Sequence, residues 1–299
     1  MSRYKKIKFI DLRKFCDQHL PNKRDNLFSA FIKVVFIFVI AGIISSVVYF
    51  GVYYKNYRSE LNIIKEDRNI FYGNSIGNAN TKLLKQNGDY KAWIRLKGTN
   101  LDNPIYKTDN NSFYINHNSV KKKSRYGSLF FDSACELSDK NSVIYGNNAE
   151  YGLMFGTLER LREISFYKKN SVIEFTEDTI ETNFIIYAVF VLNSKEEQDN
   201  GNIYDIYKTK FETQEDFDAW IDDARQRSVV ETNVSVGLND KIITLVTDCE
   251  DFEDARLVVM ARSQRNGEDL YTTQDMACLN KTPKFPKIWY DKRNIKYPF

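Results

Sequence analysis

The side chains able to do chemistry in this sequence are few and widely spaced. The 299 residues include two histidines and four cysteines, and no two cysteines form a C-x-x-C pair. Zinc sites and disulfide frameworks need ligands at short, repeated spacings, so we expect neither, and no metal or other cofactor. A thiolate is a nucleophile, so the cysteines are the side chains here that could carry covalent chemistry.

The body that carries most of these cysteines has to fold from residues that follow a very different N-terminal segment. Residues 1–33 carry nine Lys and Arg against three Asp, a net charge of +6, whereas the whole chain has a formal net charge of +3. The remainder is therefore mildly acidic, at −3. Nucleic-acid binding needs clustered basic side chains that neutralise phosphates, and the body has no such stripe. The charge therefore argues against nucleic acid as a partner.

Residues 34–54 form an uncharged, apolar run that predicts a transmembrane helix. As a helix the run is ~30 Å long, which matches the hydrocarbon core of a bilayer. A buried core helix and a cleavable signal peptide are the alternatives, but tyrosines at the outer end, the basic lead-in and the lack of a small-residue cleavage site favour a membrane span. The excess of basic residues before the span predicts a cytoplasmic N-terminus and an extracytoplasmic body at the cell membrane.

After the span, residues 55–88 have the pattern of a polar, partly helical stalk, with apolar residues too sparse for a core of their own. Residues 263–299 carry prolines among lysines and tyrosines, and they predict an irregular C-terminal tail. This tail is either a binding segment or a flexible end.

Between these segments, residues 89–262 contain short β-rich runs separated by Gly, Asn and Asp, which predicts a mainly β domain built as a closed or nearly closed barrel. Helices interrupt the strands at residues 154–162 and at about 215–227, where Thr213 and Asp216 resemble a capping box. The seven runs are residues 92–96, 126–131, 142–146, 171–175, 184–192, 241–247 and 255–261.

Three groups of residues on separate predicted strands carry a family resemblance. In this combination the sequence resembles the sortases, and the long helix before the last strands is similar to that of class B. The resemblance covers about residues 89–262 and implies an eight-stranded β-barrel with class B helical insertions. The groups are residues 93–105, residues 126–132 with 143–156, and residues 244–249 with 252–259.

The resemblance implies a function at the surface of Gram-positive bacteria. Sortases are membrane-anchored cysteine transpeptidases, in which the cysteine attacks a sorting-signal peptide of a secreted protein and forms a thioester. An amine of cell-wall peptidoglycan or of another protein then resolves the thioester, while a histidine transfers the proton and an arginine steadies the oxyanion. The implied partners are sorting-signal peptides, an amine acceptor and the membrane.

The sequence departs from the family pattern at two of three catalytic positions. The family motif Tyr-Gly-His-Asn has Asn147 in place of its histidine, and an amide does not exchange protons near pH 7. The family motif Thr-Leu-x-Thr-Cys has Asp248 in place of its cysteine, and Cys249 comes one residue late. A shift by one residue along a strand reverses the face to which a side chain points, unless a bulge or loop restores it. The arginine position is intact at Arg256.

These departures leave alternatives open at each position. Cys249 is either a displaced nucleophile held by Arg256 or a small residue beside a lost active site. Asp248 is either paired with Arg256, where a thiolate would otherwise sit, or a solvated acid. His117 has either a structural part in its loop or serves as a substitute base.

The other cysteines give no clear assignment from the sequence. Cys135 and Cys278 are both extracytoplasmic and could pair, but spacing does not give their distance. Cys16 is expected to be a free cytoplasmic thiol or a lipidation site.

The resemblance and its departures are compatible with two functions. One is a class B sortase with impaired or altered transpeptidase or endopeptidase activity at Cys249 and Arg256. The other is a catalytically inactive relative that keeps the peptide cleft as a binding or accessory module.

Overall fold

The computed structural model describes residues 19–299, apart from the side chains of residues 271–273. The expectations for residues 1–18, including the role of Cys16, lie outside the described residues. The chain divides into two compact units, with the boundary after Leu61.

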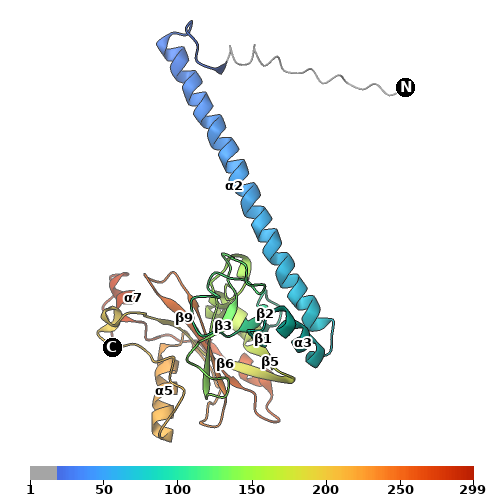
Figure 1. The fold of residues 1–299 in the computed structure, drawn as a ribbon. Helices are drawn as coiled ribbons and strands as arrows, with labels where there is room; N and C mark the ends of the chain where they lie inside the picture. Colours follow the sequence, from blue (N-terminus) through green and yellow to red (C-terminus); the bar gives the residue numbers. More distant parts are fainter. Residues whose placement is uncertain (1–18) are drawn as a thin grey trace. The chain divides into compact units, whose positions relative to one another are not determined.

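The first unit is dominated by the N-terminal part of helix α2, Leu27–Tyr72, shown in blue in Figure 1. Its most apolar stretch has a mean hydropathy of 2.7, and none of that stretch is buried in the protein. Among the described residues, α2 is the one helix long and apolar enough to cross a bilayer. The predicted apolar run at residues 34–54 lies within this helix.

The second unit begins with the last turns of α2 and the short helix α3, Ile76–Gln86. The predicted stalk does not stand apart from the barrel over this stretch, since Phe71 and Leu83 are buried in an aromatic cluster with barrel residues. The Phe71 ring stacks on Trp93 of the barrel with centroids 4.2 Å apart. Arg68 donates to the backbone carbonyl of Asp102 at 2.9 Å. Few apolar residues suffice here because each one packs on a surface that the barrel already provides.

Eight strands close into a barrel in the order β1-β2-β3-β4-β8-β9-β6-β5, which confirms the predicted fold. The pairs β2·β3 and β4·β8 are parallel and the others are antiparallel. Sequence patterning missed β2, because its Asp-Asn-Pro start is unusual inside a strand. The strands are β1 (Tyr90–Leu96), β2 (Asp102–Tyr106), β3 (Leu129–Phe131), β4 (Asn141–Tyr145), β5 (Val172–Glu177), β6 (Ile180–Leu192), β8 (Ile242–Asp248) and β9 (Arg256–Ser263).

Helical insertions join these strands. The predicted helix at about 215–227 is α5, Gln214–Arg227, and the Thr213 hydroxyl accepts a hydrogen bond from the Asp216 amide at 3.1 Å. Phe217 and Ile221 on its inner face join the large core beside the barrel. The predicted helix at 154–162 is only a 3₁₀ turn, followed by an α-helix. These shorter elements are η1 (Glu150–Gly152), η2 (Leu158–Arg162), α4 (Ile164–Asn170) and η3 (Glu196–Asp199).

Residues 263–299 are folded rather than an irregular tail. They contain α6 (Leu270–Asp275), β10 (Cys278–Leu279) and α7 (Lys287–Asp291), and β10 pairs with β7 (Val230–Glu231). Such short elements leave no periodic signal in a sequence. Tertiary contacts hold them instead, because Phe285 is buried and stacks on Trp289 with centroids 4.1 Å apart.

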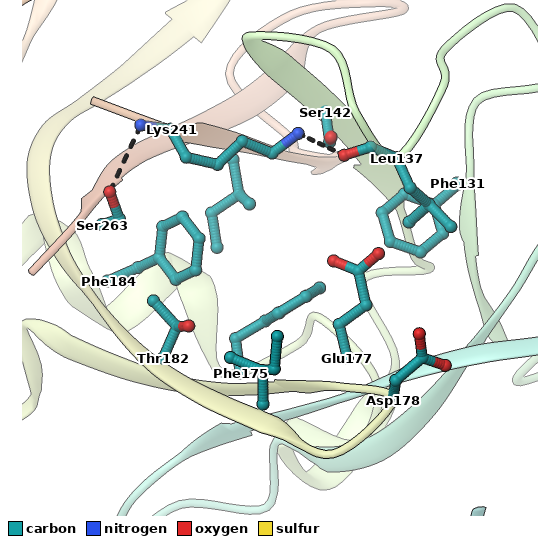
Figure 2. A pocket seen from close by; sticks show the side chains of 12 residues that line it. Phe131, Leu137, Ser142, Phe175, Glu177, Asp178, Thr182, Phe184, Lys241 and Ser263 are labelled. Carbon is teal, nitrogen blue, oxygen red and sulfur yellow. Dashed lines mark hydrogen bonds between the residues drawn. The ribbon is translucent and has the colours of Figure 1, made fainter. Parts of the chain in front are cut away.

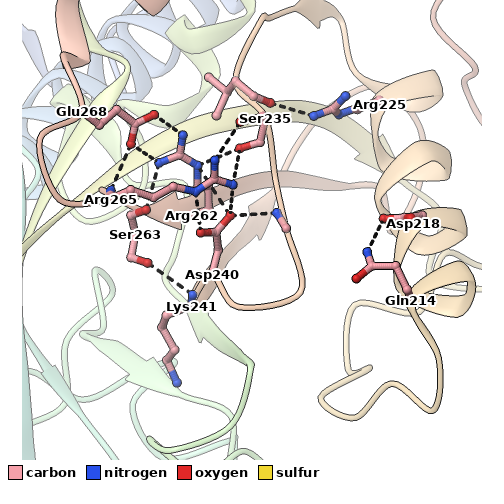
Figure 3. A network of polar contacts seen from close by, with 12 residues as sticks. Gln214, Asp218, Arg225, Ser235, Asp240, Lys241, Arg262, Ser263, Arg265 and Glu268 are labelled. Carbon is pink, nitrogen blue, oxygen red and sulfur yellow. Dashed lines mark hydrogen bonds and ion pairs between the residues drawn. The ribbon is translucent and has the colours of Figure 1, made fainter.

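A buried polar network fixes the end of β9 (Figure 3). Arg262 is fully buried, forms an ion pair with Glu268 and lies 3.8 Å from Asp240. Its Nε donates to the Ser235 carbonyl at 2.9 Å, and Arg265 completes the network with a 2.7 Å ion pair to Asp240. Each buried charge therefore has an opposite charge beside it, which buried ionic groups require.

Candidate functional site

The predicted site residues meet at one end of the barrel, where β4 and β8 finish and β9 begins. Because β4 and β8 are parallel, Tyr145 at the end of β4 lies beside Val246 near the end of β8. The antiparallel pairing of β8 and β9 then places Asp248 directly opposite Arg256. The sequence positions 147, 248 and 256 are thus brought to neighbouring strand ends.

Asp248 and Arg256 form an ion pair across these two strands. Their side chains are 63% and 38% exposed, so the pair lies at the surface. An exposed pair contributes little to folding, about 0–1 kcal/mol. The ion pair matters more for the chemistry of the site than for folding, because the Arg256 guanidinium already has a negative partner within the chain.

Cys249 has surroundings opposite to those of its neighbour Asp248. It is only 7% exposed, and its backbone N–H donates to the Ala255 carbonyl at 3.2 Å in the turn that leads to β9. Burial, together with the nearby Asp251 carboxylate, raises the pKa of the Cys249 thiol to about 12. A thiol with this pKa is protonated at neutral pH and is a poor nucleophile.

The carboxylate beside that thiol, Asp251, is held by side chains from two segments that are distant in the sequence. Arg162 of η2 makes two hydrogen bonds to it, at 2.8 and 3.0 Å, and the indole N–H of Trp289 in α7 donates to it at 3.1 Å. Arg293 lies 3.6 Å away. Burial opposes ionisation, but the hydrogen bonds and charge of Arg162 outweigh it and hold the pKa of Asp251 below its ordinary value. The loop after β8 is therefore fixed from outside the barrel.

Asn147 lies just past the end of β4, and its position is set by backbone contacts. Its side-chain amide donates to the Ile115 carbonyl at 2.8 Å, and its own carbonyl accepts the amide of Phe155 at 3.1 Å. The preceding Gly146 packs so tightly that a Cβ there would lie 2.3 Å from Leu129. The Asn147 amide is thus ordered, with a donor and an acceptor but no group that is protonated or deprotonated near pH 7.

A cleft of about 390 Å³ adjoins the ion pair. Tyr145, Val246 and Arg256 line its barrel side. The other side is lined by Leu192 at the end of β6 and by residues 193–194 and 203–207 of the β6–α5 connection. The Tyr145 and Tyr207 hydroxyls are hydrogen-bonded at 2.6 Å and tie the two sides together. The cleft volume is within the range of about 300–1,000 Å³ that is typical of ligand sites.

Several of these groups have no signal in the sequence. Arg162, Asp251 and Trp289 belong to three segments whose proximity only the fold creates. Tyr145 stood in a recognised motif, but the β6–α5 connection that faces it has no pattern of its own.

The other candidate residues, His117, Cys135 and Cys278, do not line this cleft. The His117 ring stacks on Phe113 with centroids 4.1 Å apart, and its Nδ1 lies 2.8 Å from the Phe113 carbonyl oxygen, which favours a structural part in its loop. Cys135 is a buried free thiol and Cys278 an exposed one, so the two do not pair. In the described part of the chain, no three His, Cys, Asp or Glu side chains are grouped as metal ligands.

Solved structures show which class of protein has this architecture. The Staphylococcus aureus sortase B–substrate complex superposes with a TM-score of 0.63 and 26% identity, over 71% of this chain and 100% of that chain. Clostridium perfringens sortase B gives a TM-score of 0.56 and 32% identity, over 62% of this chain and 100% of that chain. The barrel is therefore a sortase fold.

Sequence relatives identify the family within this class. Sortase B of Staphylococcus aureus is 31% identical over 185 residues, and sortase B of Listeria monocytogenes is 32% identical over 184 residues. Each match covers 60% of this chain and 72% of the relative. No family model matches the chain. On the strength of the two relatives, the chain belongs to the sortase B family.

Proposed function

We propose that this chain is a catalytically inactive sortase B relative that binds sorting-signal peptides at the cell surface. The observation that carries the proposal is the Asp248–Arg256 ion pair at the strand ends where the family resemblance places the nucleophile and its arginine. A carboxylate at this position cannot form the thioester on which the family's reaction depends. The guanidinium also meets a fixed negative charge instead of a developing oxyanion.

Two further features support the loss of activity. The thiol next to Asp248 in the chain, Cys249, is buried beside Asp251, and its raised pKa keeps it protonated. Asn147 occupies the position that the resemblance assigns to the proton-transferring histidine, and an amide cannot fill that role. Loss of either member of a nucleophile–base pair costs orders of magnitude in rate, so loss of both leaves no efficient route to the reaction.

The cleft itself supports retained peptide binding. Its two sides are held together by the Tyr145–Tyr207 hydrogen bond, and Arg256 offers donors at its end. A sortase B with the same fold has been solved with a substrate bound. We infer that this chain binds a peptide of the same class without cleaving it. The other function considered from the sequence, an altered transpeptidase that passes a peptide to a peptidoglycan or protein amine, would need Cys249 to reach the cleft.

The same proposal places the protein in the membrane. The apolar part of α2 would span the bilayer, and the basic residues 1–33 would remain in the cytoplasm, so that the barrel faces outward. A pseudoenzyme anchored in this way would meet secreted proteins as they leave the membrane. It would act as a binding or accessory module of the Gram-positive cell wall.

The test uses the full chain in detergent micelles and a fluorescent peptide taken from the substrate of Staphylococcus aureus sortase B. We expect saturable binding by fluorescence anisotropy and no acyl adduct on the protein by mass spectrometry. Arg256→Gln should weaken binding by about tenfold, the usual effect of losing a hydrogen bond to a charged group. Arg95→Gln is the matched control, since Arg95 is a similarly exposed arginine with one carboxylate partner outside the cleft.

The outcomes separate the two functions. An acyl adduct on Cys249 would show that the chain is an active transpeptidase of altered geometry. Absence of binding, or equal binding by the Arg256→Gln and Arg95→Gln variants, would show that the cleft does not recognise this peptide class.

A further inference from the structure

A second pocket lies at the opposite end of the barrel, where β8 begins and β9 ends (Figure 2). Lys241 and Ser263 mark this end, whereas Asp248 and Arg256 mark the other. Seven residues of extended strand separate the two ends, a distance of about 20 Å. The pocket has a volume of about 400 Å³, which is sufficient for a small molecule. It is therefore distinct from the peptide cleft.

The walls of this pocket are aromatic. Phe131, Phe175 and Phe184 come from three different strands, and all three are buried. Their rings meet edge to face, with centroids 6.5 Å apart for Phe131 and Phe175 and 5.6 Å for Phe175 and Phe184. At the rim, Ile180 is 67% exposed. An apolar group bound here would be removed from water and would pack against the phenylalanine rings.

Two oxygen-bearing side chains on this pocket form no hydrogen bond or contact ion pair within the described residues. The Ser142 hydroxyl is buried and, within the described residues, has no hydrogen-bond partner. Such a group normally finds one, because burying an unsatisfied hydroxyl is costly. The half-buried Glu177 carboxylate likewise has no ion pair in the described part of the chain, and Figure 2 shows it pointing from the end of β5 into the space between Phe175 and Phe131. Burial raises the pKa of Glu177.

The charge balance of the lining favours a cation. The two acids Glu177 and Asp178 face one base, Lys241. The Lys241 ammonium donates to the backbone carbonyls of Leu137 and Asp139. Its charge attracts the Glu177 carboxylate, but the two side chains form no contact ion pair in the described part of the chain. A carboxylate in apolar surroundings is stabilised most by a donor that carries positive charge.

We propose that this pocket binds a small primary amine with an apolar body. The ammonium would donate to the Glu177 carboxylate and to the Ser142 hydroxyl. The apolar body would pack among the three phenylalanines. This site is independent of the proposed peptide cleft and does not require it.

The test measures binding of benzylamine to the full chain in detergent micelles by isothermal titration calorimetry, with protein-free micelles as the blank and benzyl alcohol as the uncharged comparison. We expect saturable binding of benzylamine and much weaker binding of benzyl alcohol. Glu177→Gln should weaken benzylamine binding by about tenfold or more, as expected for loss of a charge-assisted hydrogen bond. Ser142→Ala should weaken it by a smaller factor.

Glu174→Gln is the matched control, because Glu174 lies on the same strand but pairs with Arg95 outside this pocket. It should leave benzylamine binding unchanged. The proposal fails if benzylamine does not bind at millimolar concentrations, if benzyl alcohol binds equally well, or if Glu177→Gln and Glu174→Gln behave alike. Thermal unfolding of each variant confirms that it is folded, and peptide binding at the other end should not change.

Discussion

The carboxylate of Asp248 and the guanidinium of Arg256 face each other from directly opposed positions on β8 and β9, and they form an ion pair. The pairing register alone brings them together, since no bulge interrupts β8 and β9. The next residue, Cys249, is turned to the buried side. The chain therefore presents an ion pair at the end of its cleft, and the adjacent thiol of Cys249 does not line that cleft.

The first prediction concerns the restoration of catalysis. The double variant Asn147→His with Asp248→Cys should form an acyl adduct with the sorting-signal peptide, because an exposed thiol beside Arg256 would have a lowered pKa and a histidine would supply the proton. Mass spectrometry of the intact protein would detect the adduct. The single variant Asp248→Cys should be alkylated by iodoacetamide but should acylate far more slowly. If the double variant forms no adduct although it binds the peptide, the cleft has lost more than two catalytic side chains.

The second prediction concerns the reactivity of Cys249. With a pKa of about 12, its thiolate fraction at pH 7 is about one part in 10⁵, so iodoacetamide should leave it unlabelled in the folded protein. Cys278 is exposed and should be labelled first, which makes it the internal control. Labelling of Cys249 should rise only at strongly alkaline pH or on unfolding. Peptide mapping after alkylation at pH 7 and pH 9 checks this, and equal labelling of both thiols at pH 7 would contradict it.

The third prediction concerns the loop after β8. Asp251→Asn should destabilise the barrel by about 1–3 kcal/mol, because Arg162 loses its buried negative partner while the amide keeps an acceptor for Trp289. Urea unfolding followed by tryptophan fluorescence measures this, since all three tryptophans lie in the second unit. Alkylation of Cys249 should become faster in the same variant.

The exposed residue Asp254 provides the matched control for this loop, since it forms a surface pair with Lys195 at 2.7 Å. Asp254→Asn should change the free energy of unfolding by less than about 1 kcal/mol. A similar decrease in the free energy of unfolding in Asp251→Asn and Asp254→Asn would show that the Asp251 contacts do not stabilise the loop.

The fourth prediction concerns the pH dependence of stability. The hydrogen bond and charge of Arg262 hold the pKa of Glu268 below its ordinary value. For Asp240, burial acts in the opposite direction, but Arg265 and the backbone of Gly237 outweigh it, and its pKa is also lowered. Groups with lowered pKa values in the folded state contribute stability above their unfolded values of about 4, and this contribution is lost as the pH falls through the folded values.

Urea unfolding between pH 6 and pH 3 should therefore show a falling free energy of unfolding. The double variant Asp240→Asn with Glu268→Gln should start from a lower stability at pH 6 and show a flatter decline. An identical slope in the variant and the native protein would mean that other carboxylates dominate the acid response.

The fold was predictable because its signals are local. The hydrophobic runs at residues 184–192, 241–247 and 255–261 are strands in the structure, and Thr213 caps α5 as its spacing predicts. Elements that lack local periodicity were missed. Strand β2 contains Pro104, and α7 has only five residues, so contacts with distant parts of the chain stabilise them.

The candidate site was predictable only in part. Motif order was enough to single out Asn147, Asp248 and Arg256, because the family resemblance assigns a role to each position. The direction of the Cys249 side chain was open, since a loop after a strand can restore or reverse the alternation of faces. Nothing in the sequence connected Asp251 with Trp289, which lie 38 residues apart.

By itself, the sequence determined which groups are available: one apolar run long enough to span a bilayer, a set of barrel strands, and a chain without a histidine or a cysteine at the two family positions. Only the tertiary structure decided which of these groups are buried and which are paired. It pairs Asp248 with Arg256 and buries Cys249 beside Asp251, and it leaves Glu177 without an ion-pair partner in the described chain. The physical reason is that side-chain identity is local, whereas burial, charge pairing and pKa depend on which distant segments the closed barrel brings into contact.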